Sequence, residues 1–378
     1  MNDAVPDEKI SSLLAERITA GDFPSAVYVI AESGRTLLAD ALGHAVREPE
    51  RHAATLSTVY DLASLTKPLV TGLLCARQIE RGRLVLDQPV AQYLPEFDRT
   101  DKRAITVRQL LTHTSGLPAW RPLYILARGE TERALQVIAE EPLESAPGTH
   151  VLYSDLGFIT LGLLLERIAG ERLAGMARRE IFEPLGLRRT FFNPEMAMRT
   201  AVAACETGNA YEREMCGDLS ETRGFQNWRE HLIWGEAHDG NAHFLGGAAG
   251  HAGLFSTGHE TLHLAEQFLA GRTRLLKPET CQLFRTNMTE GLEEARSFAW
   301  QLAATKDSTA GQSLPPDGFG HTGFTGTSCW NDPARERTFI LLTNRTHARA
   351  LPFANINSVR RHFHTLAVAA LDEIAGGG

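Results

Sequence analysis

Segments with the residue pattern of β-strands occur near both ends of the chain. Near the start, residues 25–32 and 36–43 flank a short Ser-Gly-Arg turn, which is the pattern of a hairpin. After residue 290, strand patterns return at 297–304, 321–330 and 337–345. A first helix is expected over 8–20 and a closing helix over about 355–375. The two ends together predict one antiparallel sheet flanked by helices, which is an α+β fold built from both termini.

The intervening stretch has mainly helical periodicity. Apolar residues recur at helical spacing over 106–113, 131–140, 155–170, 173–182 and 261–271, and connections rich in proline or glycine separate these segments. A chain of 378 residues suits about two domains. We therefore expect a sheet domain of residues 1–81 and 290–378, a mostly helical insertion domain of residues 82–289, and the active site between them.

Charge and hydropathy exclude two classes of partner. The net charge of −8 is spread without long runs of one sign, whereas a nucleic-acid-binding protein calls for a basic stripe. The longest apolar run, residues 157–170, is too short to span a bilayer and contains charges near its end. The sequence therefore predicts a buried helix at this run and neither a nucleic-acid nor a membrane partner.

The cysteines and the N-terminus bear on the cellular compartment. Five cysteines at irregular spacing predict neither a disulfide framework nor a zinc site, and they favour a reducing compartment. The first 22 residues lack the basic start and apolar stretch of a signal peptide. The sequence favours a cytoplasmic protein, or a secreted one whose leader has been removed, and it leaves the oligomeric state open.

The segment DLASLTK, residues 61–67, places a serine and a lysine three positions apart. Residues 64–81 have the pattern of a helix, and Pro68 is tolerated in its first turn. A helix N-terminus stabilises negative charge at Ser64, and the spacing puts Lys67 on the same face. A lysine in a dry pocket loses its proton readily and can take the proton of a serine. The spacing therefore predicts an activated nucleophile, although Ser-x-x-Lys also occurs by chance in surface helices.

Two later stretches carry compatible chemistry. Tyr153, Ser154 and Asp155 lie at the start of a helical segment, where a tyrosine can share a proton with Lys67 and a neighbour can cap the helix. Residues 321–328 (HTGFTGTS) have a strand-like context, and their glycines either let a substrate lie along the strand or mark a bulge.

The three stretches together resemble a known superfamily. SLTK (64–67), YSD (153–155) and HTG (321–323) have the order and separations of the motifs of serine β-lactamases and penicillin-binding proteins. The chain resembles the branch that contains class C β-lactamases, D-alanyl-D-alanine peptidases and family VIII carboxylesterases. Residues 110–118, 237–257 and 339–345 are similar to further stretches of this superfamily, so that the resemblance covers about residues 24–370.

This resemblance implies roles for individual residues. Ser64 would form an acyl-enzyme, and Lys67 and Tyr153 would be its base network. The backbone N–H groups of Ser64 and Phe324 would form the oxyanion hole.

Four residues are expected to bind substrate: Asp155, His321, Thr322 and Gly323. Asparagine and lysine usually occupy the positions of Asp155 and His321. A mostly neutral imidazole and a carboxylate that cannot donate a hydrogen bond both disfavour anionic substrates. We therefore expect a carboxylesterase that acts on small neutral esters, without a cofactor. A β-lactamase or D-alanyl-D-alanine peptidase is the alternative within this class, with an ester or amide as substrate, and a non-catalytic scaffold is the alternative from another class.

Other signals are assigned structural roles. A group of histidines with Asp239 allows a metal site but matches no known ligand pattern, so a polar loop without metal is expected there: His231, His238, His243 and His251. His113 is expected to be buried and hydrogen-bonded. The GFGHTG stretch (318–323) is not a dinucleotide site, because more strand follows it.

Overall fold

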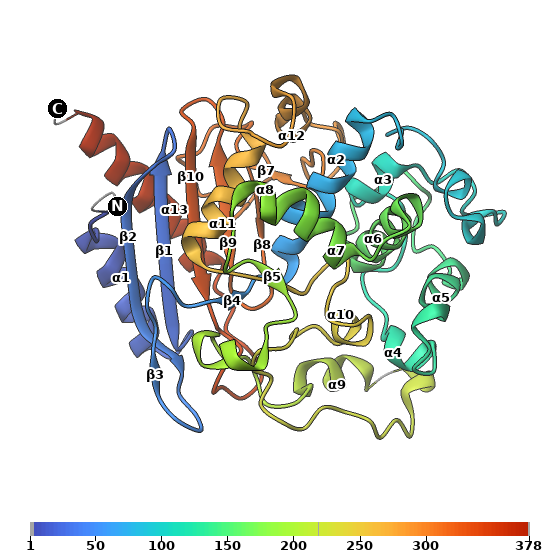
Figure 1. The fold of residues 1–378 in the computed structure, drawn as a ribbon, viewed down its shortest axis with the longest axis horizontal. Helices are drawn as coiled ribbons and strands as arrows, with labels where there is room; N and C mark the ends of the chain where they lie inside the picture. The colour runs from blue at the N-terminus through green and yellow to red at the C-terminus, as the bar shows by residue number, and fades with distance from the viewer. Residues whose placement is uncertain (1–3, 218, 377–378) are drawn as a thin grey trace.

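A seven-stranded antiparallel sheet takes its strands from both ends of the chain (Figure 1). The computed structural model describes residues 4–217 and 219–376. In spatial order the strands are β3 (His52–Ala53), β2 (Arg35–Val46), β1 (Ser25–Glu32), β10 (Arg337–Thr343), β9 (Ser328–Asp332), β8 (Phe319–Thr322) and β7 (Gln301–Leu302). The α+β architecture expected from the sequence is confirmed.

The central pair β1 and β10 joins the two ends of the chain. Their register runs from Ala26 opposite Thr343 to Glu32 opposite Arg337. Side chains alternate between two cores: Val27 and Val29 face the helical layer, whereas Tyr28 and Ile30 face the terminal helices. Both faces are covered, so the strands are almost continuously apolar.

Helices α1 (Glu8–Thr19) and α13 (Asn357–Gly376) cover one face of the sheet, and Figure 1 shows them adjacent at one side of the molecule. An ion pair of 2.9 Å between Lys9 and Glu373 links them. On the opposite face, α11 (Gly258–Ala265) packs so closely that a Cβ at Gly258 would lie 2.8 Å from Val29. Only a glycine permits this approach.

The helical layer is built around α6 (Asp155–Ala169), which is buried on most of its surface. Its N-cap is Ser154, whose hydroxyl accepts from the Gly157 N–H at 3.2 Å, and Gly170 ends it in the left-handed conformation. The other helices of this layer are α2 (Leu73–Glu80), α3 (Val107–Leu111), α4 (Leu123–Leu126), α5 (Ala134–Glu140), α7 (Leu173–Ala177), α8 (Glu183–Leu185), α9 (Ala210–Cys216), α10 (Gly240–Phe244) and α12 (Gln282–Arg285). The buried helix expected at residues 157–170 is confirmed.

A second, small sheet was not predicted from the sequence. It joins β4 (Tyr60–Asp61), β6 (Leu254–Ser256) and β5 (Phe191–Phe192) in that order. Strands of two or three residues are too short to show a period of two. This sheet matters because β4 leads directly into Ser64.

Three predicted elements differ in detail. Residues 63–80 are helical but pass through a 3₁₀ turn (Ala63–Leu65), a π-helical stretch (Lys67–Gly72) and then α2. Residues 321–330 are two strands joined by a turn, because Gly326 has φ of +108°. Within 297–304 only Gln301–Leu302 pair as a strand.

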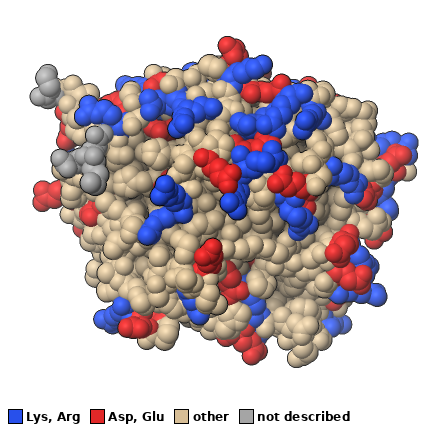
Figure 2. Space-filling view, viewed as in Figure 1, with Lys and Arg blue, Asp and Glu red and all other residues tan. Residues whose placement is uncertain are grey.

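In the face drawn in Figure 2, cationic and anionic side chains are interspersed. Among the described residues, no helix combines the length and the apolar character needed to cross a membrane.

Candidate active site

Ser64 follows a strained residue. Ala63 has φ of +47°, a conformation that is costly for a residue with a Cβ and that clusters at functional sites. The buried Asp61 holds this turn, because its carboxylate accepts from the Ala63 N–H and from the His238 N–H, both at 2.8 Å. Ser64 is thereby presented at a rigid bend.

Lys67 is fully buried and points at Ser64. Its Nζ lies 2.9 Å from Ser64 Oγ, 2.7 Å from Asp155 Oδ1 and 3.2 Å from the backbone oxygen of His251. Burial lowers the pKa of Lys67, but the charge of Asp155, followed by that of Tyr153, outweighs burial, so that the net pKa is raised. In the resting site Lys67 is therefore an ammonium that donates to Ser64.

Tyr153 completes this group. It directly precedes the cap of α6, and Lys67 Nζ lies 4.9 Å from the centre of its ring. Burial raises the pKa of Tyr153, and the charge of Lys67 only partly offsets the rise. Its phenol is therefore protonated at neutral pH, and Ser64 gains a base only when Lys67 or Tyr153 loses a proton.

The turn between β8 and β9 is tied to the nucleophile turn. Thr327 Oγ1 donates to the Leu62 oxygen at 2.9 Å, and Thr325 Oγ1 donates to the Asp61 oxygen at 2.7 Å. A Cβ at Gly323 would lie 2.5 Å from the Leu62 oxygen. Phe324 is thus held beside the residues that lead into Ser64.

His321 differs chemically from the lysine that is usual at its position. Burial, followed by the charges of Lys67 and Arg296, lowers its pKa well below the usual value, so the imidazole is neutral. Its Nδ1 lies 2.8 Å from the Thr322 backbone oxygen and must carry the proton. Its Nε2 is buried and without a hydrogen-bond partner among the described residues, so it presents a free lone pair.

A glycine-rich loop, residues 246–253, packs behind Lys67. Gly250 lies against α6, where an added Cβ would be 2.0 Å from the Phe158 oxygen. Thr71 Oγ1 donates to the Gly250 oxygen at 2.7 Å. These contacts place the His251 carbonyl where it accepts from the lysine ammonium.

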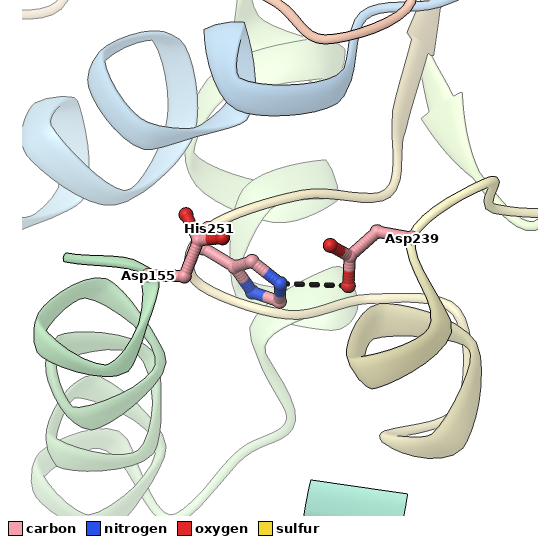
Figure 3. A group of neighbouring side chains, drawn as sticks. All are labelled: Asp155, Asp239 and His251. Carbon is pink, nitrogen blue, oxygen red and sulfur yellow. Dashed lines mark hydrogen bonds and ion pairs between the residues drawn. The ribbon is translucent and has the colours of Figure 1, made fainter. Parts of the chain in front are cut away.

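Three side chains beside the serine could in principle hold a cation (Figure 3). Asp155 begins α6, Asp239 caps α10, and His251 lies on the loop that follows α10; their ligand atoms all lie within 4.8 Å of one another. His251 Nε2 is 2.8 Å from Asp239, and Asp155 is paired with Lys67. Both carboxylates thus have a partner within the chain, and the ammonium already supplies positive charge.

The histidine group considered from the sequence is not assembled as one cluster. His238 pairs with Glu206 at 2.7 Å, and His243 lies 3.4 Å from Glu236, which also contacts His231. His238 lines the active-site cavity and stacks on Phe324 with ring centres 5.5 Å apart, whereas His251 reaches Lys67 through its backbone oxygen. His113 is buried as expected, and its Nδ1 accepts from the Ser154 N–H at 3.0 Å.

A cavity of about 650 Å³ unites the predicted residues. It is lined by Ser64, Tyr153, Asp155, His321, Thr322, Gly323 and Phe324, and Lys67 lies buried behind the serine. Sequence reasoning missed several further lining residues, which are Tyr211, Glu212, Arg296, Arg345 and Arg360. These residues reach the cavity through long-range packing. The 237–257 stretch, which contains Asp239, was the sequence signal for one part of this lining.

A serine and a buried lysine within hydrogen-bond distance, beside a tyrosine and a cavity, define a serine hydrolase of the fold shared by β-lactamases and penicillin-binding proteins. A family model described as Beta-lactamase matches residues 10–359. The chain belongs to the β-lactamase family.

Curated relatives and solved structures agree with this class. An Escherichia coli K12 protein, named provisionally a D-alanyl-D-alanine carboxypeptidase, is 32% identical over 320 residues, which are 78% of this chain and 71% of the relative. The structure of EstCE1, a hydrolase with promiscuous acyltransferase activity, is similar at a TM-score of 0.73 and 25% identity, with 94% and 97% of the two chains covered. A penicillin-binding-protein homologue from Caulobacter crescentus has the same fold at a TM-score of 0.72 and 20% identity, with 97% and 99% covered.

Proposed function

We propose that this protein is a carboxylesterase that hydrolyses small neutral esters through an acyl-enzyme on Ser64. The observation that carries the proposal is the 2.9 Å contact between Lys67 Nζ and Ser64 Oγ at the floor of an open cavity. The comparisons support the reaction class, and the charge pattern of the cavity supports the choice of substrate.

In the first half-reaction, the reacting enzyme is the form in which the Lys67–Tyr153 pair has already lost one proton to solvent. Ser64 Oγ attacks the ester carbonyl carbon, and its proton passes to this deprotonated pair. The backbone N–H groups of Ser64 and Phe324 bind the oxyanion. The pair then protonates the departing alcohol as the carbon–oxygen bond breaks. In the second half-reaction, water attacks the acyl-serine, releases the carboxylic acid and returns the proton to Ser64.

The choice of neutral esters rests on two positions. Asp155 places a carboxylate 2.7 Å from Lys67, and His321 is a neutral acceptor where a cationic donor is usual. Neither group attracts an anion to the scissile bond. A substrate with a negative charge near the scissile bond is therefore bound less well than an uncharged ester.

A second candidate is a D-alanyl-D-alanine carboxypeptidase, which the names of the curated relatives suggest. One feature of the cavity favours it: Arg345 and Arg360 line the cavity, and both donate to backbone oxygens without a carboxylate partner among the described residues. Such guanidinium groups suit a terminal carboxylate.

The test compares substrates on the pure protein. We expect kcat/KM for a short-chain nitrophenyl ester to exceed that for an anionic chromogenic cephalosporin by about 10–100-fold, which corresponds to 1.4–2.8 kcal/mol. Release of D-alanine from a D-alanyl-D-alanine peptide with greater efficiency than ester hydrolysis would establish the second candidate instead.

Covalent labelling separates an enzyme from a scaffold. A fluorophosphonate should modify Ser64, as located by peptide mass spectrometry, and Ser64→Ala should abolish both labelling and turnover while it leaves the circular dichroism spectrum unchanged. Because removal of a nucleophile costs many orders of magnitude in rate, retention of most esterase activity by Ser64→Ala would overturn the proposal.

A further inference from the structure

Four hydrogen-bond acceptors line the cavity of Ser64, together with donors such as Arg296. We call Asp155, Glu212, Asp239 and His321 the acceptor wall; all four line the same cavity. From these residues we infer that the preferred substrates are esters or amides whose acyl group carries a primary ammonium, that is, aminoacyl compounds. This inference rests on the proposed acyl-enzyme function on Ser64 and revises its substrate class, because an acyl group with a positive charge would be preferred over an uncharged one.

His321 supplies the observation that is independent of the carboxylates. Only 5% of the residue is exposed, and its Nδ1 proton is directed to the Thr322 backbone oxygen at 2.8 Å. The remaining nitrogen, Nε2, has no partner in the described part of the chain. A buried acceptor without a donor is costly, and a ligand N–H group would satisfy it.

Glu212 is a second acceptor, and it has no cation among its direct hydrogen-bond partners in the described residues. Its two oxygens accept from the Gly240 N–H at 2.7 Å and from the Tyr124 hydroxyl at 2.9 Å, and both of these donors are neutral. Burial, followed by the charge of Asp239, raises the pKa of Glu212 to about 7. A ligand ammonium would supply the missing positive charge and keep this carboxylate ionised.

The two aspartates extend this surface towards the nucleophile. Asp155 Oδ1 binds Lys67 at 2.7 Å and Asp239 Oδ1 binds His251 at 2.8 Å, while the side chains keep 18% and 20% of their surface exposed. Asp155 is separated from Ser64 Oγ only by the Lys67 ammonium, which contacts both. An ammonium one or two bonds from the acyl carbon therefore lies within reach of this wall.

Two cationic side chains beside the turn of residues 323–327 bear on the direction of binding. Arg345 donates to the Phe324 oxygen at 2.6 Å, and Arg360 donates to the Gly323 oxygen at 2.8 Å. These fixed positive charges repel an ammonium from the side of the oxyanion turn. The charged end of the acyl group is thereby restricted to the acceptor wall.

The experiment uses a pair of isosteric esters. Alanine methyl ester and methyl isobutyrate differ only in an ammonium in place of a methyl group, and both release methanol, which can be measured. We expect kcat/KM for at least one enantiomer of the alanine ester to exceed that for methyl isobutyrate at least tenfold at pH 7. N-acetylation of the alanine ester should remove the advantage, because it removes the charge.

Two variants test the wall itself. Glu212→Gln and His321→Lys should each lower the ratio of kcat/KM between the two esters at least threefold, the first by removing a charge and the second by placing a cation at the site. Asp87→Asn is the matched control, because this exposed residue pairs with Arg108 outside the cavity and its loss should leave the ratio unchanged. His321→Lys keeps the test decisive if Glu212→Gln does not fold.

The outcomes separate this inference from the proposed function. Equal or faster hydrolysis of methyl isobutyrate, with Ser64 still labelled, would overturn the acceptor-wall inference and leave the esterase intact. A preference for the alanine ester that both variants retain would also overturn it. Failure of both esters together with an unlabelled Ser64 would overturn the proposed function.

Discussion

Individual charges decide when Ser64 is reactive. Lys67 carries a raised pKa because the carboxylate of Asp155 lies 2.7 Å away, and burial also raises the pKa of Tyr153. A group acts as a base only in its deprotonated form. The reactive fraction of the enzyme should therefore increase as the pH rises through the alkaline range.

Asp155→Asn should move this pH dependence. Without the carboxylate, burial dominates and lowers the pKa of Lys67, so more of the enzyme holds a neutral lysine at a given pH. We expect the rising limb of kcat/KM for a neutral ester to shift by about one pH unit or more towards acid. Asp87→Asn serves as the control. If the rising limb of kcat/KM against pH lies at the same pH in Asp155→Asn as in this control, then Asp155 does not set the pKa of Lys67.

The base network has its own test. Lys67→Arg keeps the charge but cannot deprotonate at useful pH, and Tyr153→Phe keeps the ring but removes the hydroxyl. Because proton transfer contributes about 10²–10⁴-fold, each variant should slow acylation by about that factor with little change in melting temperature. Burst kinetics with a nitrophenyl ester measure this step, and wild-type acylation in Tyr153→Phe would remove the tyrosine from the mechanism.

At this scale the sequence predicted that Ser64, Lys67 and Tyr153 lie together, but not what surrounds them. Ser64 and Lys67 could be paired because residues three apart share a helix face. The carbonyl that holds Lys67 belongs to His251, 184 positions away, and no local pattern encodes that contact. The positive φ of Ala63 could not be predicted either, because alanine rarely adopts this conformation.

Among the elements, the glycine-rich loop 246–253 controls the position of Lys67. It passes so close to α6 that Gly250 has no room for a side chain. The sequence showed the loop as a connection, since glycine content indicates a turn but not what the turn packs against. Its role follows from the helix that it contacts.

Gly250→Ala tests this packing. The added methyl group would meet the Phe158 oxygen at 2.0 Å, so the loop must move and the His251 carbonyl with it. We expect a loss of about 1–3 kcal/mol of unfolding free energy in urea, together with a fall in kcat.

Gly157→Ala, in the helix α6 that Gly250 contacts, is the control. Its nearest neighbour outside the helix backbone would be 3.7 Å away, so it should be neutral or slightly stabilising. Equal stability of Gly250→Ala and Gly157→Ala would contradict the packing argument.

For the whole molecule, one core crosses the boundary drawn from the sequence. Val27 of β1 and Leu164 of α6 belong to the same buried cluster, although the first lies in the expected sheet domain and the second in the helical insertion. The division at residues 81 and 290 remains a prediction about the chain. The order of strands and helices could be predicted because apolar residues recur at strand or helix spacing within each long element.

The shared core predicts a single unfolding transition. Helix content by far-UV circular dichroism and tryptophan fluorescence should change at the same urea concentration. Ile340→Ala removes buried side-chain volume from β10. It should lower the free energy of unfolding by about 2–5 kcal/mol, and both signals should report the same loss. Two separated transitions would instead show independently stable domains.

The pairing of β1 with β10 also sets the order of events while the chain is made. Ser25 and Asn344, which are hydrogen-bonded at 3.1 Å, are 319 residues apart, so at 5–20 residues per second the ribosome needs roughly 15–60 s to deliver the partner strand. During that interval the nascent β1–β2 hairpin has an open edge for a chaperone to cover. The guanidinium of Arg360, which donates to the Gly323 oxygen, emerges later still, so the cavity of Ser64 is complete only after residue 360 has been made.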